Sequence, residues 1–96
     1  MTEAEFTDEI LGWAKLNGWR RFHVRGNTRR LIQGDVGFPD LVLVRVPRVI
    51  FAELKVGKNK LKIEQKQWQL DLFHSGVEVY EWRPEEWRRI MDLLKR

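Results

Sequence analysis

The pattern of apolar and polar residues predicts a β-hairpin in the middle of the chain. Two apolar runs rich in β-branched residues, 41–44 and 49–55, flank a short connection that contains Pro47. Residues of this kind favour strands, and a short connection between two strands gives an antiparallel pair. Because proline is disfavoured as the second central residue of a type I turn, the pattern favours a four-residue loop over residues 45–48.

A loop centred on the Val46–Pro47 bond also fixes which residues face each other across the hairpin. In this register Asp40 faces Glu53 at the end of the hairpin that is opposite the loop. Lys55 follows Glu53 by two residues, so its side chain points to the same face of the sheet. The pattern therefore predicts that two acids and one base meet at one end of an otherwise apolar hairpin.

Apolar residues at helical spacing predict three helices around the hairpin. A capping box formed by Thr2 and Glu5 begins the first helix, and Gly18 ends it. A second helix extends over about residues 62–74, and Pro84 lies in the first turn of a third. The second helix has apolar residues on two sides, so we expect it to pack against the sheet and also against another helix or a second subunit.

Two further stretches, residues 19–25 and 77–82, alternate in the way that predicts strands. The order of elements is then α-β-β-β-α-β-α around one mixed central sheet. A chain of 96 residues with 43% hydrophobic content suits one domain with one modest core. The expected fold class is therefore α/β, with residues 1–96 forming a single domain.

The composition excludes several classes of protein. The chain has no cysteine, so it has neither a disulfide framework nor a thiolate metal site. Its two histidines, His23 and His74, are too far apart in sequence to form a local zinc motif. No apolar run is long enough to span a bilayer, and the N-terminus lacks a signal-peptide pattern. We therefore expect no membrane partner and a cytoplasmic location.

The positive charge of the chain is concentrated in two segments on either side of the hairpin. The formal net charge is +4, but residues 20–30 contain five arginines and no acid, and residues 55–66 contain five lysines and one glutamate. Such clusters suit contact with a phosphate backbone, while a solvated surface loop explains either segment alone equally well. The candidate DNA-binding residues are Arg25, Arg29, Arg30, Lys58, Lys60 and Lys62.

The two acids of the hairpin define the candidate chemistry. Two carboxylates this close repel each other, and at least one is driven towards protonation unless a cation lies between them. A hard divalent ion such as Mg²⁺, held by one or two carboxylates and several waters, resolves the repulsion. The ammonium of Lys55 beside it would activate a water and stabilise charge on a phosphate. These groups suit metal-assisted hydrolysis of a phosphodiester.

Pro39-Asp40, followed by Glu53-Leu54-Lys55, resembles the motif of the PD-(D/E)XK nuclease superfamily. Four stretches resemble its VRR-NUC branch in the standalone, phage-type form: residues 37–44, 51–55, 61–68 and 76–84. The resemblance extends over nearly the whole chain. It implies a restriction-endonuclease-like core and a metal-dependent DNA endonuclease, encoded by a phage or bacterium, that acts on branched or junction DNA in repair, recombination or phage DNA processing.

The resemblance also implies roles for individual residues. The metal, Mg²⁺ or Mn²⁺, would be held by Asp40, Glu53, the backbone carbonyl of Leu54 and Glu3, the last directly or through water. Lys55 would orient the attacking water. Gln65 would hold a water or a phosphate oxygen.

Several of these roles have simpler alternatives. Glu3 extends the buried stripe of the first helix, but it also complements the positive end of the helix dipole, and Glu5 and Glu9 compete for the same role. Gln65 is equally well explained as a solvent-facing residue. At the level of function, the alternatives are a catalytically silent DNA-binding module and a subunit of a larger nucleic-acid-processing complex. Because a chain of this size offers little surface to a branched substrate, we expect a homodimer with two sites.

Overall fold

The structure is a computed structural model that describes residues 1–24 and 33–96. Its elements have the predicted order: α1 (Glu3–Leu16), β1 (Arg20–His23), β2 (Leu41–Arg45), β3 (Arg48–Leu54), α2 (Ile63–His74), β4 (Glu78–Trp82), the 3-10 turn η2 (Pro84–Glu86) and α3 (Trp87–Leu94). Within the two described ranges, no helix is both long enough and apolar enough to cross a membrane.

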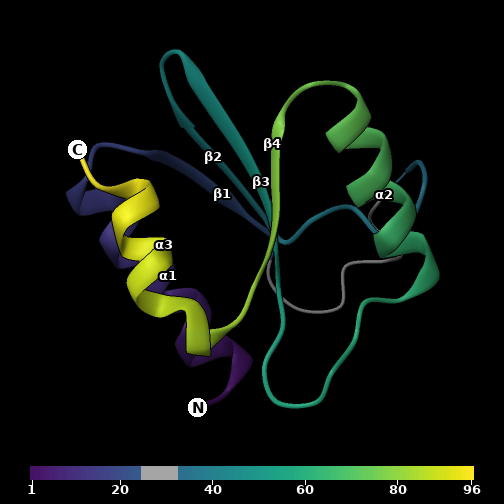
Figure 1. The fold of residues 1–96 in the computed structure, drawn as a ribbon, viewed down its shortest axis with the longest axis horizontal. Coiled ribbons are helices and arrows are strands. Elements are labelled where there is room, and N and C mark those ends of the chain that lie inside the picture. Colours follow the sequence, from purple (N-terminus) through teal and green to yellow (C-terminus); the bar gives the residue numbers. More distant parts are fainter. Residues whose placement is uncertain (25–32) are drawn as a thin grey trace.

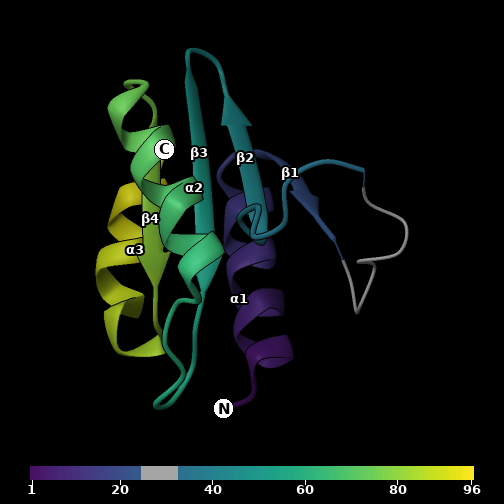
Figure 2. The same cartoon turned by 90° about the vertical axis from the view of Figure 1, so that its right-hand side faces the viewer.

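The four strands form one mixed sheet in the order β1-β2-β3-β4. β1, β2 and β3 are antiparallel neighbours, whereas β4 lies parallel to β3. A parallel neighbour requires a crossover connection, and α2 provides it. Figures 1 and 2 show α1 and α3 together on one face of the sheet and α2 on the other. The predicted α/β architecture with a mixed central sheet is confirmed.

The hairpin has the predicted register but a shorter loop. Val42 pairs with Phe51, and Leu41 pairs with Ala52, as the pattern requires. The four-residue loop over residues 45–48 is wrong, because Arg45 and Arg48 still pair and only two residues lie between the strands. The Val46–Pro47 peptide bond is cis, and a type VI turn takes a cis proline at its second central position.

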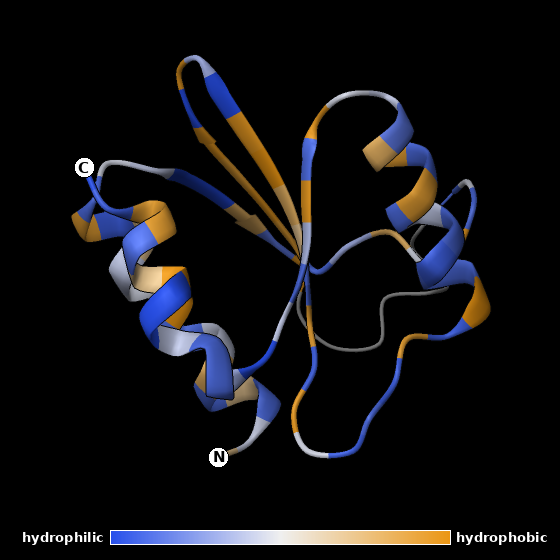
Figure 3. Ribbon diagram, in the orientation of Figure 1, coloured by the Kyte–Doolittle hydropathy of each residue, from blue (hydrophilic) through white to orange (hydrophobic). Residues whose placement is uncertain are grey.

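The hydrophobic core lies between the sheet and the layer formed by α1 and α3. One face of β2 and β3 contributes alternate residues, and Figure 3 shows apolar residues running along both strands. The residues with the least exposed surface are Phe6, Ile10, Ala14, Leu41, Leu43, Ile50, Ala52, Leu54, Ile90 and Leu94. Leu54 belongs to this face, so its neighbour Glu53 belongs to the opposite one.

The first helix begins and ends as predicted. Thr2 and Glu5 form both hydrogen bonds of the capping box, at 2.8 and 3.1 Å, and the helix ends before Gly18, which has a positive φ of 80°. Trp13 Nε1 donates to the carbonyl of Met91 at 3.0 Å, which ties the helix to α3. These contacts fix the layer on which the sheet rests.

Helix α2 has two different sides, as its sequence pattern predicts. The side towards the sheet is half-buried, and Gln69 Nε2 donates to the carbonyl of Tyr80 at 3.1 Å. The other side carries three exposed apolar residues, Ile63, Leu70 and Phe73, with 82%, 52% and 66% of their surface accessible. Helix α2 therefore packs on the sheet with one side and leaves the apolar residues of its other side exposed.

Candidate active site

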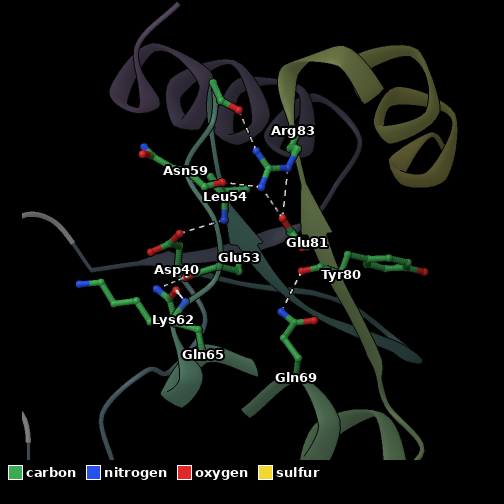
Figure 4. Close-up of polar contacts among 11 residues, drawn as sticks. Asp40, Glu53, Leu54, Asn59, Lys62, Gln65, Gln69, Tyr80, Glu81 and Arg83 are labelled. Atoms are coloured by element: carbon green, nitrogen blue, oxygen red, sulfur yellow. Dashed lines mark hydrogen bonds and ion pairs between the residues drawn. The ribbon is translucent and has the colours of Figure 1, made fainter. Parts of the chain in front are cut away.

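The end of the hairpin brings together the two predicted acids. Asp40 immediately precedes β2, and Glu53 is the last residue but one of β3. Asp40 Oδ2 accepts a hydrogen bond of 2.9 Å from the backbone N–H of Leu54, which holds the carboxylate against β3 (Figure 4). The pairing of the two strands therefore places Asp40 beside Glu53 although Asp40 itself lies just outside the ladder.

Glu53 is a buried acid in a repulsive environment. Only 2% of its surface is accessible. Burial raises its pKa to about 9, and the charge of Asp40 and a hydrogen bond to the Asp40 carboxylate act in the same direction. Without a cation, the pair of carboxyl groups therefore keeps a proton to a higher pH than a free glutamate does. A carboxylate pair of this kind is a candidate functional site, since a purely structural hairpin gains nothing from it.

Two further charged residues act on Glu53. Lys55 follows β3, and its positive charge counteracts the rise in the pKa of Glu53. Glu3, exposed in the first turn of α1, makes the smallest contribution to that rise. Of the competing acids in α1, Glu5 is held by the N-cap through the N–H of Thr2, and Glu9 is exposed. Glu3 is thus the acid of α1 whose charge reaches the pair.

Gln65 connects the start of α2 to the carboxylate pair. Its Oε1 accepts the N–H of Lys62 at 2.8 Å, and its Nε2 lies 3.4 Å from Oε2 of Glu53 (Figure 4). The first contact caps the helix and fixes the orientation of the amide. Gln65 therefore faces the site rather than solvent, and one oxygen of Glu53 has a neutral donor.

Gly37 allows the segment before Asp40 to lie directly on α2. Its φ is +96°, and a Cβ atom placed there would meet the backbone of Glu64 and Gln65 at 2.6 to 2.9 Å. Trp68 Nε1 donates to the carbonyl of Val36 at 3.1 Å, and the rings of Phe38 and Trp68 meet edge to face at 5.0 Å. The segment that ends in Asp40 is therefore anchored to the helix that carries Gln65.

Sequence reasoning missed His23 as a neighbour of the site. Its Nδ1 lies 3.0 Å from the carbonyl oxygen of Asp40, so the ring with hydrogen on Nδ1 donates to that oxygen. His23 pairs with Leu41 across β1 and β2. Predicting this pairing requires the register of β1, and the irregular alternation of residues 19–25 does not define it.

The predicted DNA-binding residues divide into two groups. Lys58, Lys60 and Lys62 are exposed on the loop between β3 and α2, which joins Lys55 to Gln65. In the described part of the chain, none of these three lysines forms an ion pair. The other group, Arg25, Arg29 and Arg30, lies outside the described residues.

The carboxylate pair has the oxygen donors that a small divalent cation takes. Among residues 1–24 and 33–96 no three His, Asp or Glu side chains are close enough to hold a metal together. Mg²⁺ does not need three, since it is often bound by one or two carboxylates and completes its shell with water. Asp40 and Glu53 each have one oxygen held by the chain, through Leu54 and Gln65, and a second oxygen that can face a cation.

Comparison with known proteins identifies the fold. No family model and no curated protein matches the sequence. A solved structure described as a VRR_NUC domain protein superposes with a TM-score of 0.68 at 19% identity, over 86% of this chain and 78% of that one. Hjc from Archaeoglobus fulgidus, described as a Holliday junction resolvase, superposes with a TM-score of 0.58 at 17% identity, over 84% of this chain and 69% of that one. The chain therefore has the restriction-endonuclease-like fold that its motif predicts.

Proposed function

We propose that this protein is a metal-dependent DNA endonuclease that hydrolyses phosphodiester bonds. The observation that carries the proposal is the buried Glu53, which faces Asp40 and has Lys55 beside it. Burying one acid beside a second one destabilises a domain of this size, and a bound cation would offset the repulsion between the two carboxylates. The shared fold of the two solved structures supports the same assignment.

Asp40, Glu53 and the backbone carbonyl of Leu54 would hold Mg²⁺ or Mn²⁺, with Glu3 contributing directly or through a water. When bound, such an ion polarises the scissile phosphate and lowers the pKa of a water. Asp40 is preorganised for this role because the N–H of Leu54 fixes one of its oxygens. Gln65 does the same for Glu53, although its contact of 3.4 Å is long.

Lys55 acts on the substrate side of the carboxylate pair. Its ammonium donates hydrogen bonds to the attacking water and to the phosphate, and so offsets the negative charge that develops in the transition state. Gln65 would hold a water or a phosphate oxygen with the amide hydrogen that does not face Glu53. For this role the Lys55 side chain has to extend beyond Glu53 towards the phosphate. Its charge already lowers the pKa of Glu53, so the two side chains are close.

The substrate class proposed is branched DNA, with the four-way junction as the first candidate. One neighbour in fold is described as a Holliday junction resolvase. The exposed lysines 58, 60 and 62, together with Arg25, Arg29 and Arg30, would contact phosphates and position the backbone without reading bases. A homodimer would present two such sites to a branched substrate, and the exposed apolar side of α2 supports self-association.

The test is cleavage of labelled duplex, single-stranded, flap, splayed-arm and four-way junction DNA in the presence of Mg²⁺, Mn²⁺ or EDTA. Wild type is compared with Asp40→Asn, which keeps an oxygen to accept the N–H of Leu54 but has no negative charge. Asp92→Asn is the matched control, because Asp92 is exposed on α3.

The proposal predicts cutting that requires the divalent ion, is abolished in Asp40→Asn and is unchanged in Asp92→Asn. Junction cutting faster than duplex cutting would support the substrate class. Equal cutting by wild type and Asp40→Asn would overturn the assignment of the site. DNA binding that depends on salt, without cutting of any substrate, would favour a catalytically silent DNA-binding module instead.

A further inference from the structure

Arg83 holds the loop between β3 and α2 from the side of β4. Its Nη1 donates to the carbonyl of Gly57 at 3.1 Å, and its Nη2 donates to the carbonyl of Asn59 at 2.6 Å. The same guanidinium forms an ion pair with Glu81, in which Nε and Nη2 both donate to Oε2, at 3.1 and 2.8 Å (Figure 4). One side chain therefore connects β4 to two backbone carbonyls of the loop.

The loop that Arg83 holds has few other anchors and carries the basic residues. Lys58 and Lys60 alternate along the chain with Gly57 and Asn59, the two residues whose carbonyls accept hydrogen bonds from Arg83. Both lysines are exposed. Among the described residues, the other hydrogen bond made by residues 56–61 runs from the N–H of Asn59 to the carbonyl of Val56, at 3.3 Å. Arg83 therefore determines where these lysines lie relative to Lys55.

Glu81 gives the guanidinium a fixed orientation. It lies opposite Glu53 in the parallel pair of β3 and β4, so it is on the face of the sheet that carries the carboxylate pair. Both members of the Arg83–Glu81 ion pair are partly buried, with 26% and 34% of their side-chain surface accessible. The ion pair thus fixes the loop relative to the strand that contains Glu53.

We propose that Arg83 is a positioning residue for DNA binding, which preorders residues 57–59 so that Lys58 and Lys60 meet the phosphate backbone without a further loss of conformational freedom. This inference rests on the proposed function for its DNA partner. Its structural half, that Arg83 orders residues 57–59 in the free protein, does not depend on DNA. A loop that is ordered before binding loses less entropy on binding, so affinity rises without any new contact to the ligand.

The structure provides a matched control in Arg48. Its guanidinium also forms an ion pair with an acid of β4, Glu78, through Nε and Nη2, and also donates to a backbone carbonyl, that of Leu93. Arg48 precedes the core residue Ile50 by two positions, so it lies on the same face of β3, which α1 and α3 cover. Arg48→Gln therefore removes a comparable set of bonds on the face opposite the loop.

The structural half is tested without DNA by trypsin digestion of the native protein, with cleavage after Lys58 and Lys60 followed by mass spectrometry. Arg83→Gln is expected to speed these two cleavages relative to both wild type and Arg48→Gln. Equal rates in all three proteins would overturn the inference whether or not the protein binds DNA.

The DNA half is tested by fluorescence anisotropy with a labelled duplex in EDTA, which prevents cleavage. Arg83→Gln is expected to weaken binding about three- to tenfold, because the loop must then be ordered on binding. Its dependence on salt should stay close to that of wild type, since the lysines remain. The variant Lys58→Ala/Lys60→Ala should lower the slope of log affinity against log salt by up to about 2.

Combining the variants distinguishes positioning from general destabilisation. Adding Arg83→Gln to Lys58→Ala/Lys60→Ala should cause little further loss of affinity, because the position of the loop matters only while its lysines are present. Additive losses, or an equal loss in Arg48→Gln, would overturn the inference. A wild-type protein that binds no DNA would refute the proposed function instead, while the trypsin result would still decide the role of Arg83 in the loop.

Discussion

At the scale of single residues, Glu53 is where stability and function conflict. Its carboxyl group is buried beside another acid, and the residue is recognisable in the sequence because the period of a strand places Lys55 and Glu53 on one face. The contacts of His23 and Arg83 were not predictable in the same way. Each joins segments that are far apart in the chain through the end of a side chain, and no sequence period describes such contacts.

The conflict predicts that Glu53→Gln does not destabilise the metal-free protein. Glutamine has nearly the same shape, carries no charge and can donate a hydrogen bond to Asp40. We expect a free energy of unfolding at neutral pH equal to that of wild type or higher by about 1 kcal/mol, measured with urea in EDTA. A loss of several kcal/mol would show instead that the ionised carboxylate is a structural requirement.

A second residue-scale prediction concerns the pair of Arg48 and Glu78. Hydrogen bonds from Arg48, followed by one from Tyr80, hold the pKa of Glu78 below its ordinary value of 4.5. A lowered pKa in the folded state means that the stability gained is present above that ordinary value and is lost as the pH falls through the lowered pKa. Because both partners of the ion pair are about a third exposed, the gain is under about 1 kcal/mol.

The measurement is urea unfolding of wild type and Glu78→Gln over a range of pH. The stability difference between the two proteins should be largest near neutrality and shrink as the solution is acidified below the ordinary pKa of glutamate. A difference that stays constant with pH would contradict the pKa shift.

At the scale of elements, the approach of the Gly37 segment to α2 is what assembles the site. The strands and helices were predictable because capping boxes, glycines and alternation are local signals. The contacts between them were less predictable, since α2 packs on the sheet with only one of its two apolar sides and leaves Ile63, Leu70 and Phe73 exposed. The hairpin loop is shorter than predicted, because the strand pairing continues to Arg45 and Arg48.

This approach predicts that Gly37→Ala is harmful for two reasons. The substitution combines an unfavourable positive φ with a clash against the backbone of Glu64 and Gln65. We expect it to destabilise the protein by about 2 kcal/mol or more and to slow cleavage, because Asp40 and Gln65 move apart. Thermal or urea unfolding and cleavage of the preferred DNA are the measurements.

Gly76→Ala is the control for the backbone conformation alone. Gly76 has a similar φ of +83°, but a Cβ atom there meets nothing within 4 Å. The Gly76→Ala variant should lose about 1 kcal/mol of stability and keep the cleavage rate of wild type. Equal behaviour of the two alanine variants would mean that the close contact at Gly37 has no special role.

At the scale of the whole molecule, the chain places its core on one side of the sheet and its candidate chemistry on the other. α1 and α3 cover the apolar face. Glu53 and α2 lie on the opposite face, and Figures 1 and 2 show α2 as a separate layer there. The element order and the mixed sheet followed from the sequence because each strand and helix was signalled locally. The oligomeric state was not predictable to the same degree, since it depends on a surface rather than on a pattern.

The proposed homodimer is tested through the exposed side of α2. Phe73 has 66% of its surface accessible, so Phe73→Glu is not expected to affect the folding of one chain. Analytical ultracentrifugation should find wild type as a dimer and Phe73→Glu shifted to the monomer, with unchanged unfolding. A wild-type protein that is monomeric at every concentration would show that the chain does not form the proposed homodimer.

The claim that Asp40 and Glu53 hold a cation for DNA cleavage is tested by the single-turnover cleavage rate of Glu53→Gln in Mg²⁺, measured on its preferred DNA. The control is Glu85→Gln, since Glu85 is exposed. If Asp40 and Glu53 exist to hold a cation at a phosphate, Glu53→Gln should be folded and slower than wild type by about a thousandfold, while Glu85→Gln cuts normally. A folded Glu53→Gln protein that cuts at the wild-type rate would contradict the claim.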